Sequence, residues 1–114
     1  FIPSQPSSSV DAYVKEHYME KISLRSLGEM FYINNVYLGQ LYKKRYHIVF
    51  RDYLNQLRLE KAKELLEDTD TRIYRIAEET GFGKADYFIN KFVQVYGITP
   101  NQYRMKFKKS GRGN

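Results

Sequence analysis

The chain has 114 residues, enough for one small domain or two very small lobes with a modest hydrophobic core. It contains no cysteine, which excludes disulfides, thiolate metal sites and a cysteine nucleophile. Its 19 Lys and Arg residues outnumber its 13 Asp and Glu residues, and the resulting net charge of +6 favours a polyanionic partner. No apolar run approaches the roughly 20 residues of a membrane span, so we expect no membrane association, and the absence of cysteine fits the reducing cytoplasm in which we expect the protein.

The N-terminal part of the chain is predicted to pass from a linker into short helices. Residues 1–9 contain a serine run and all but one of the prolines, a composition typical of a linker tail. From Val10 to about Glu20 the apolar residues recur at helical spacing. Ser23 and Asn34 are each placed to cap the N-terminus of a further helix. The sequence does not begin with Met, and we interpret it as a fragment of a longer protein.

The rest of the chain also carries helical signals. The longest periodic stretch covers 50–67 and ends in a polar run. A short helix then closes at Gly81, and a longer one over 84–96 closes at Gly97, because glycine permits the left-handed turn after a helix. Pro100 suits the first turn of a final helix. No stretch alternates between apolar and polar residues with period two, so the predicted fold class is all-α.

The second half of the chain repeats the first half at a separation of 50 positions. The identical pairs are Tyr37 and Tyr87, Tyr46 and Tyr96, Ile48 and Ile98, and Tyr53 and Tyr103. Residue type is kept between Tyr32 and Phe82, Leu38 and Phe88, and Tyr42 and Phe92. Each copy is predicted to form a short helix, a tight turn and a second helix with a polar face, which is the helix-turn-helix pattern.

Two such copies on a basic chain predict two modules that bind one DNA duplex. The predicted division is a tail over 1–9, a first helix-turn-helix subdomain over 10–48, a connecting helix over 49–68, a second helix-turn-helix subdomain over 69–107 and a basic tail over 108–114. A connecting helix of about 27 Å is close to the ~34 Å rise of one DNA turn. The two recognition helices are therefore expected to enter successive major grooves.

The second helix of each copy is the candidate recognition helix, because burial of its apolar residues turns a polar face outward. Side-chain amides bond adenine at two atoms, aliphatic side chains cover the thymine methyl group, and a carboxylate accepts from the cytosine amine. The candidate base-reading residues are Val36, Gly39 and Gln40 in the first copy and Ala85, Asp86, Ile89 and Asn90 in the second.

Phosphate contacts are expected from polar and basic residues on or beside these helices, since they supply affinity and salt dependence rather than sequence preference. The candidates are Tyr37, Lys43, Lys44, Arg45, Lys84, Lys91 and Arg104. The basic residues at the C-terminal end are expected to add non-specific attraction: Lys106, Lys108, Lys109 and Arg112.

Three alternatives remain open at this point. A helical protein-interaction module would dock an acidic partner through the same basic faces and would show no preference among duplexes. An RNA or single-strand binder would stack bases on exposed tyrosines. An enzyme has least support, because His17 and His47 show no metal-ligand spacing and no nucleophile–base set is recognisable. We therefore predict no catalytic residue, no metal and no cofactor.

Over residues 10–107 the sequence resembles the DNA-binding domain of the AraC/XylS family of bacterial transcription regulators. The most specific matches are Ile76, Ala77, Gly81, Phe82, Tyr87, Phe88, Phe92, Gly97, Ile98, Thr99, Pro100, Tyr103 and Arg104. The first half matches through Asn34, the run 37–44, Tyr53, Leu54, Arg58, Ala62, Leu65 and Leu66. The resemblance implies seven helices in two helix-turn-helix subdomains, binding of double-stranded DNA near promoters, and contact with RNA polymerase.

Three features depart from the family pattern. His47 stands where the family usually has glycine, which predicts a different end for the first recognition helix. Gly39 offers no side chain at a position that often contacts bases. Val93 and Gln94 replace a pair that is commonly basic, so the second module is expected to hold phosphates less firmly.

The segments 31–34 and 37–40 are most similar to the YesN-type response regulators. This resemblance implies that the missing N-terminal regulatory domain is a phosphoacceptor receiver. A ligand-binding domain, as in sugar-sensing members of the family, is the alternative. We expect the fragment itself to be monomeric.

Overall fold

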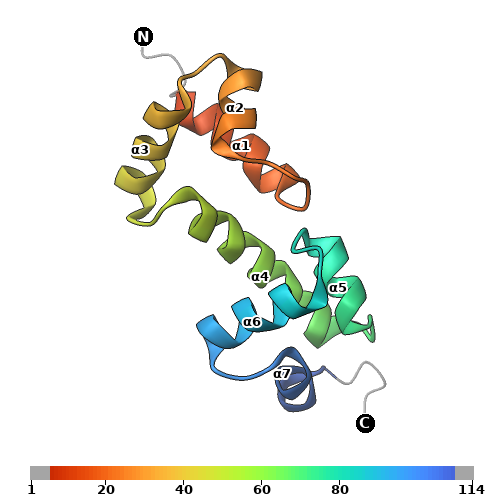
Figure 1. Cartoon of the computed structure of the whole chain (residues 1–114). Coiled ribbons are helices and arrows are strands. Elements are labelled where there is room, and N and C mark those ends of the chain that lie inside the picture. Colours follow the sequence, from red (N-terminus) through yellow and green to blue (C-terminus); the bar gives the residue numbers. More distant parts are fainter. Residues whose placement is uncertain (1–5, 110–114) are drawn as a thin grey trace. The chain divides into compact units, whose positions relative to one another are not determined.

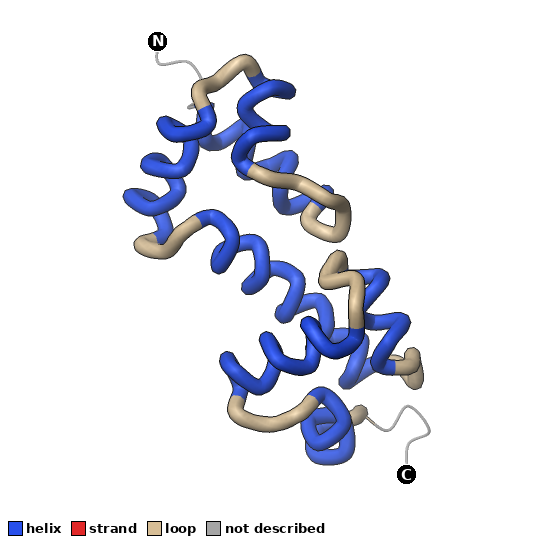
Figure 2. The backbone as a smooth tube through the Cα atoms, in the orientation of Figure 1, coloured by secondary structure: helices blue, strands red, loops and turns tan. Residues whose placement is uncertain are grey.

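The computed structural model of the protein describes residues 6–109, which form seven α-helices and no strand (Figures 1 and 2). The helices are α1 (Pro6–His17), α2 (Leu24–Phe31), α3 (Asn35–Tyr46), α4 (Phe50–Asp68), α5 (Ile73–Thr80), α6 (Ala85–Tyr96) and α7 (Pro100–Phe107). The predicted all-α fold is therefore confirmed. None of the helices in the described range is long and apolar enough to cross a membrane.

The chain divides into two compact units at a point inside α4. Unit 1 is Phe1–Leu57 and unit 2 is Arg58–Asn114. Each unit has a hydrophobic core of its own, and α4 contributes its first part to one core and its remainder to the other. The segment 49–68, predicted as a connecting helix, thus contributes one part of a single helix to the core of each unit.

The core of unit 1 is formed by the inner faces of α1, α2, α3 and the start of α4. Val10 and Val14 lie one turn apart on α1 and are fully buried. Their buried neighbours in the core are Leu27, Leu38, Tyr42, Phe50, Tyr53 and Leu54. The four helices therefore share one apolar centre, against which α3 packs through a single face.

Unit 2 repeats this arrangement with the end of α4 in the place of α1. Its buried core residues are Leu59, Ala62, Leu66, Ile76, Ala77, Phe82, Phe88, Phe92 and Tyr103. Phe88 and Phe92 lie one turn apart on α6 and are fully buried. The inner face of α6 is thus anchored by two phenylalanine rings, whose centroids are 5.8 Å apart.

The predicted helix starts are confirmed by their hydrogen bonds. The hydroxyl of Ser23 accepts from the backbone N–H of Ser26 at 3.1 Å. The Asn34 side-chain oxygen accepts from the N–H groups of Val36 and Tyr37 at 2.8 and 3.1 Å. Both satisfy donors that the first turn of a helix leaves free.

The two candidate recognition helices, α3 and α6, end in the same way, which corrects one expectation. His47 lies in the left-handed region with φ 66°, and its N–H donates to the Lys43 carbonyl at 2.8 Å. Gly97 has φ 81°, and its N–H donates to Val93 at 2.8 Å. The prediction that His47 changes the end of α3 is therefore wrong. The cap hydrogen bond offsets a strain of roughly 1–2 kcal/mol for a residue with a Cβ.

The first helix differs from its predicted bounds at both ends. It begins at Pro6, so the predicted linker over 1–9 is wrong from Pro6 onward, because the fixed φ of proline suits a first helical turn. It ends at His17 instead of Glu20. The N–H of Glu20 donates to the His17 carbonyl at 2.9 Å and forms a turn there.

The proposed pairing of Tyr32 with Phe82 in the repeat is also wrong. Tyr32 occupies the left-handed cap of α2 with φ 58° and is 94% exposed, whereas Phe82 is buried in unit 2. In unit 1 it is Ile33 that packs against the core. The cause is loop length, because residues 32–34 join α2 to α3 whereas residues 81–84 join α5 to α6.

Candidate nucleic-acid interface

The outer face of α3 carries most of the predicted contacts of the first module. Val36 is 64% exposed, and Gln40 and Lys43 are exposed on the same face, opposite the buried Leu38 and Tyr42. The phosphate candidates Tyr37, Lys44 and Arg45 are exposed as well. The helix thus presents an amide, an aliphatic group and several cations to solvent, which are the groups that a major groove and its phosphates require.

Gly39 and Gly28 differ in what a side chain would meet at each position. A Cβ at this position would lie 3.1 Å from Cδ1 of Leu24. A Cβ at Gly28 would lie only 2.5 Å from the carbonyl oxygen of Ile33. The absence of a Cβ at Gly28 therefore allows α2 and the turn before α3 to approach closely, whereas Gly39 meets only the flexible end of Leu24. On the outer face of α3, Gly39 offers its backbone alone.

The outer face of α6 is less polar and partly covered. Asp86 and Asn90 are exposed, whereas Ala85 is half-buried and Ile89 packs partly against the core of unit 2. An edge of Ile89 remains accessible beside Asn90. The second module therefore offers an amide and a carboxylate, with a smaller apolar surface than that of Val36.

The lysine side chains beside α6 differ in their exposure and in their contacts with neighbouring residues. Lys84 precedes α6 and is exposed. Lys91 is half-buried, with its Nζ 5.6 Å from the centroid of the Tyr87 ring and 3.4 Å from the Gln94 side-chain oxygen. Tyr87 is 37% exposed at the position that Tyr37 occupies in α3. The repeat pairs Tyr87 with Tyr37, yet the sequence-based candidates include only Tyr37.

The guanidinium of Arg104 donates hydrogen bonds to backbone carbonyls within unit 2. Its Nε donates to the carbonyl of Leu66 at 3.2 Å, and its Nη2 donates to those of Leu65 and Thr69 at 3.3 and 3.0 Å. Leu65 and Leu66 lie in the last turn of α4 and Thr69 directly follows it, and the carbonyls at this end of a helix favour a nearby cation. The structure thus gives this phosphate candidate a capping role.

Lys108 and Lys109, the described residues of the basic tail, also form contacts within unit 2. Lys108 pairs with Asp70. The Lys109 ammonium lies 3.4 Å from Asp68 and 3.8 Å from Glu67, and its backbone N–H donates to the Glu67 carbonyl at 2.8 Å. These contacts hold the chain after α7 against the acidic end of α4. Arg112, also expected to add attraction, lies outside the described residues.

Arg58 lies beside the turn between α5 and α6. It is half-buried, and its guanidinium carbon is 6.0 Å from the centroid of the Phe82 ring. Burial lowers the pKa of this guanidinium, although the nearby Tyr87 raises it. Its aliphatic stem and planar head therefore help to cover the aromatic residues that support α6.

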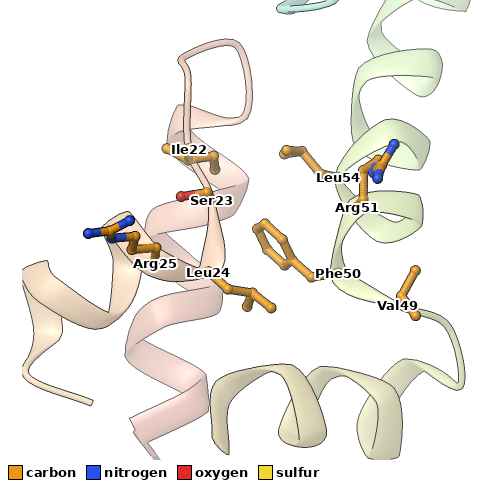
Figure 3. Close-up of a pocket in the computed structure, with 8 residues that line it drawn as sticks. All are labelled: Ile22, Ser23, Leu24, Arg25, Val49, Phe50, Arg51 and Leu54. Atoms are coloured by element: carbon orange, nitrogen blue, oxygen red, sulfur yellow. The ribbon is translucent and has the colours of Figure 1, made fainter. Parts of the chain in front are cut away.

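A cavity of about 490 Å³ lies in unit 1 between the starts of α2 and α4 (Figure 3). Phe50 and Leu54 line it from one side and Ile22 from the other. Two exposed arginines, Arg25 and Arg51, come from its opposite walls. Each is the second residue of its helix, where free backbone N–H groups and the helix dipole attract anions.

Unit 2 has a cavity of about 550 Å³ at the corresponding place, between the starts of α5 and α7. Its lining is more polar: Asp70, Arg72, Ile73, Tyr74, Asn101 and Arg104. Arg25 and Arg51 were not among the sequence-based candidates. The signal that could have found them is their position at the second residue of two helix starts in a basic chain.

Comparisons with known proteins agree with this geometry. A family model described as a helix-turn-helix domain matches residues 27–106. The solved C-terminal domain of AraT, a response regulator from Geobacillus stearothermophilus, is 32% identical with a TM-score of 0.92, and the match covers 97% of this chain and 93% of that one. The C-terminal domain of the two-component response regulator yesN from Fusobacterium nucleatum is 42% identical with a TM-score of 0.80, covering 85% and 95%.

The chain is an AraC-type helix-turn-helix domain. Among curated proteins it is 35% identical over 95 residues to the HTH-type transcriptional regulator YijO of Escherichia coli strain K12. That match covers 83% of this chain and 34% of YijO. The chain spans about a third of the length of YijO and of two further relatives, the regulatory protein PocR and the HTH-type transcriptional regulator YpdC.

Proposed function

We propose that this AraC-type domain binds duplex DNA in a sequence-dependent manner, with α3 and α6 as its two recognition helices. The observation that carries the proposal is the division of each helix into two faces. One face is fully buried, through Leu38 in α3 and Phe88 in α6, while the opposite face exposes an amide, Gln40 or Asn90. A rigidly packed helix with exposed hydrogen-bonding groups is suited to the major groove.

The proposed base contacts follow from side-chain chemistry. Gln40 and Asn90 would bond adenine, Val36 and the accessible edge of Ile89 would cover thymine methyl groups, and Asp86 would accept from a cytosine amine. Ala85 and the backbone of Gly39 would allow close approach to the bases.

The proposed phosphate contacts are the exposed cations near the two helices. They are Lys43, Lys44, Arg45 and Lys84, with Tyr37 and Lys91 as further contacts, and with Arg25 and Arg51 added from the cavity in unit 1. Arg104 is excluded from this set because its guanidinium already binds three carbonyls. Phosphate contacts set affinity and salt dependence and leave sequence preference to the bases.

We further infer that the whole protein is a bacterial transcription regulator of the response-regulator class, in which a receiver domain controls this output domain. The similarity to the C-terminal domains of yesN and AraT supports this assignment. A ligand-sensing regulator is the alternative origin, since the same fold occurs in the xylose-binding transcription activator xylR, which is 22% identical to this chain with a TM-score of 0.77. Contact with RNA polymerase, a monomeric state of this fragment and a cytoplasmic location complete the proposal.

Sequence-dependent binding is tested by selecting the duplexes that the protein binds from a randomised pool at near-physiological salt. Two enriched half-sites about one helical turn apart are expected if both helices contact bases. A single enriched half-site would mean that one module binds only the backbone. Absence of enrichment would contradict the proposal and favour a protein-interaction module whose basic faces bind an acidic partner.

A further inference from the structure

The side chain of Asp11 is buried at the centre of a polar cluster in unit 1. It is 3% exposed, and its carboxylate accepts hydrogen bonds from three tyrosine hydroxyls. Tyr42 and Tyr53 donate to Oδ1 at 3.1 and 2.8 Å, and Tyr46 donates to Oδ2. The Lys15 ammonium lies 3.5 Å from Oδ2. One carboxylate on α1 therefore joins side chains from α3 and α4.

The cluster is charged at neutral pH. Burial raises the pKa of the Asp11 carboxyl, but the hydroxyls of Tyr46, Tyr53 and Tyr42 and the charge of Lys15 outweigh burial and bring the pKa below its ordinary value. The carboxylate is thus a constant acceptor, and the tyrosine hydroxyls act as donors. Hydrogen bonds to an ionised acceptor are shorter and stronger than those between neutral groups.

Two of the three donors belong to the recognition helix. Tyr42 and Tyr46 lie one turn apart on the inner face of α3, whereas Gln40 and Lys43 are exposed. Because both hydroxyls bind the same carboxylate, they restrict rotation of α3 about its axis and sliding along it. Tyr53 from α4 closes the arrangement, with its ring stacked on that of Tyr46 at 4.2 Å between centroids.

The second recognition helix has no such anchor among the described residues. Phe92 stands in the place of Tyr42 and has no hydroxyl, and the ring of Tyr96 faces the Lys63 ammonium at 4.8 Å. Tyr103 donates to Glu67, which joins α7 to α4 without involving α6. Apolar packing requires side chains that fill the available volume, but by itself it fixes the orientation of a helix less strictly than hydrogen bonds do.

We propose that Asp11 is a positioning residue for α3, and that base recognition by the first module depends on this carboxylate even though it lies on the far side of the helix. The inference rests on the proposed function, since it concerns the helix assigned to base contact. It also makes α1, rather than the core alone, the element that sets the orientation of the first recognition helix.

The first test does not involve DNA. Hydrogen–deuterium exchange is compared between the unmodified chain, Asp11→Asn and Tyr46→Phe, the second of which removes a single hydroxyl and preserves the ring packing. Exchange of the α3 amides is expected to rise by about tenfold in both variants, with α6 unchanged. The matched control is Glu67→Gln, which weakens a tyrosine–carboxylate bond in unit 2 and should leave α3 unchanged. Unaltered exchange in α3 would overturn the proposal whatever the DNA results.

The second test measures affinities for duplexes that carry single base changes in the selected site. For Asp11→Asn and Tyr46→Phe, discrimination at the bases that depend on Gln40 is expected to fall by about tenfold, the value of a good bidentate contact. Discrimination at the bases that depend on Asn90 should be unchanged. A uniform loss at all bases would mean that Asp11 serves stability only and would overturn the positioning role. Failure of the unmodified chain to discriminate any base would instead contradict the proposed function, and the exchange measurement would still decide the role of Asp11.

Discussion

Two glycines in neighbouring helices of unit 1 would respond differently to an added methyl group. At Gly28 the Cβ would lie 2.5 Å from a backbone carbonyl oxygen, whereas at Gly39 it would lie 3.1 Å from the flexible end of Leu24. We expect Gly28→Ala to lower the free energy of unfolding by about 1–3 kcal/mol, because the backbone must shift. Gly39→Ala should be near neutral, since alanine favours the helix by about 1 kcal/mol and Leu24 can adjust. Urea unfolding of both variants checks this, and equal changes would contradict it.

Gln40 and Lys43 lie on the same exposed face of α3 but should contribute in different ways. Gln40→Ala is expected to relax sequence preference, because an amide bonds specific base edges. Lys43→Ala should weaken binding to all duplexes alike and reduce the salt slope by about one phosphate. Titrations of matched and mismatched duplexes at several salt concentrations measure both effects. An equal loss on every duplex from Gln40→Ala would contradict base contact.

At the scale of helices, Arg104 couples the end of α4 to α7. Its three hydrogen bonds go to the carbonyls of Leu65, Leu66 and Thr69. We expect Arg104→Ala to lower the free energy of unfolding by about 2 kcal/mol, because partly buried carbonyls lose a charged donor. Arg104→Lys should not restore stability, since a lysine ammonium cannot reproduce the planar fork. Thermal unfolding measures stability, and a salt slope for DNA that is reduced in Arg104→Ala and kept in Arg104→Lys would return Arg104 to the phosphate contacts.

The helices themselves were largely predictable from local signals. Ser23, Asn34 and Gly97 mark helix ends through chemistry that acts within a few residues, and the structure has caps at all three. The start of α1 was missed because proline and serine occur both in linkers and in first helical turns. The end of α3 was mispredicted at His47, because a side chain can adopt the left-handed cap when its N–H is bonded.

The outward faces of α3 and α6 could be anticipated from apolar spacing, but the partners of charged groups could not. Asp11 is 31 residues from Tyr42 and 42 residues from Tyr53 in sequence. Arg104 was assigned to phosphate on charge alone, while its acceptors are carbonyls that carry no sequence signal. Such contacts depend on how helices pack, which no local pattern specifies.

For the whole molecule, the Asp11 cluster predicts how the free energy of unfolding changes as the pH falls into the acid range. The pKa of Asp11 is lowered from its ordinary value of 3.8 in the folded chain, so its contribution is present above that value and is lost as pH falls through the folded-state pKa. The stability of the unmodified chain should therefore exceed that of Asp11→Asn at neutral pH, and the two should converge in acid. Thermal unfolding between neutral pH and about pH 2 measures the difference. A constant difference at all pH values would contradict the role of the charge.

The helix α4 completes one unit and begins the next, and this has a consequence for engineering. Its first residues, 50–57, correspond at a separation of 50 positions to α7, Pro100–Phe107. Helix α7 therefore takes the place in unit 2 that the first half of α4 takes in unit 1, with Tyr103 in the core as Tyr53 is. We expect a copy of residues 58–107 joined directly after Phe107 to continue α7 in the register of α4 and to supply a third candidate recognition helix. We therefore expect the domain to accept an added module of 50 residues, in the manner of repeat proteins.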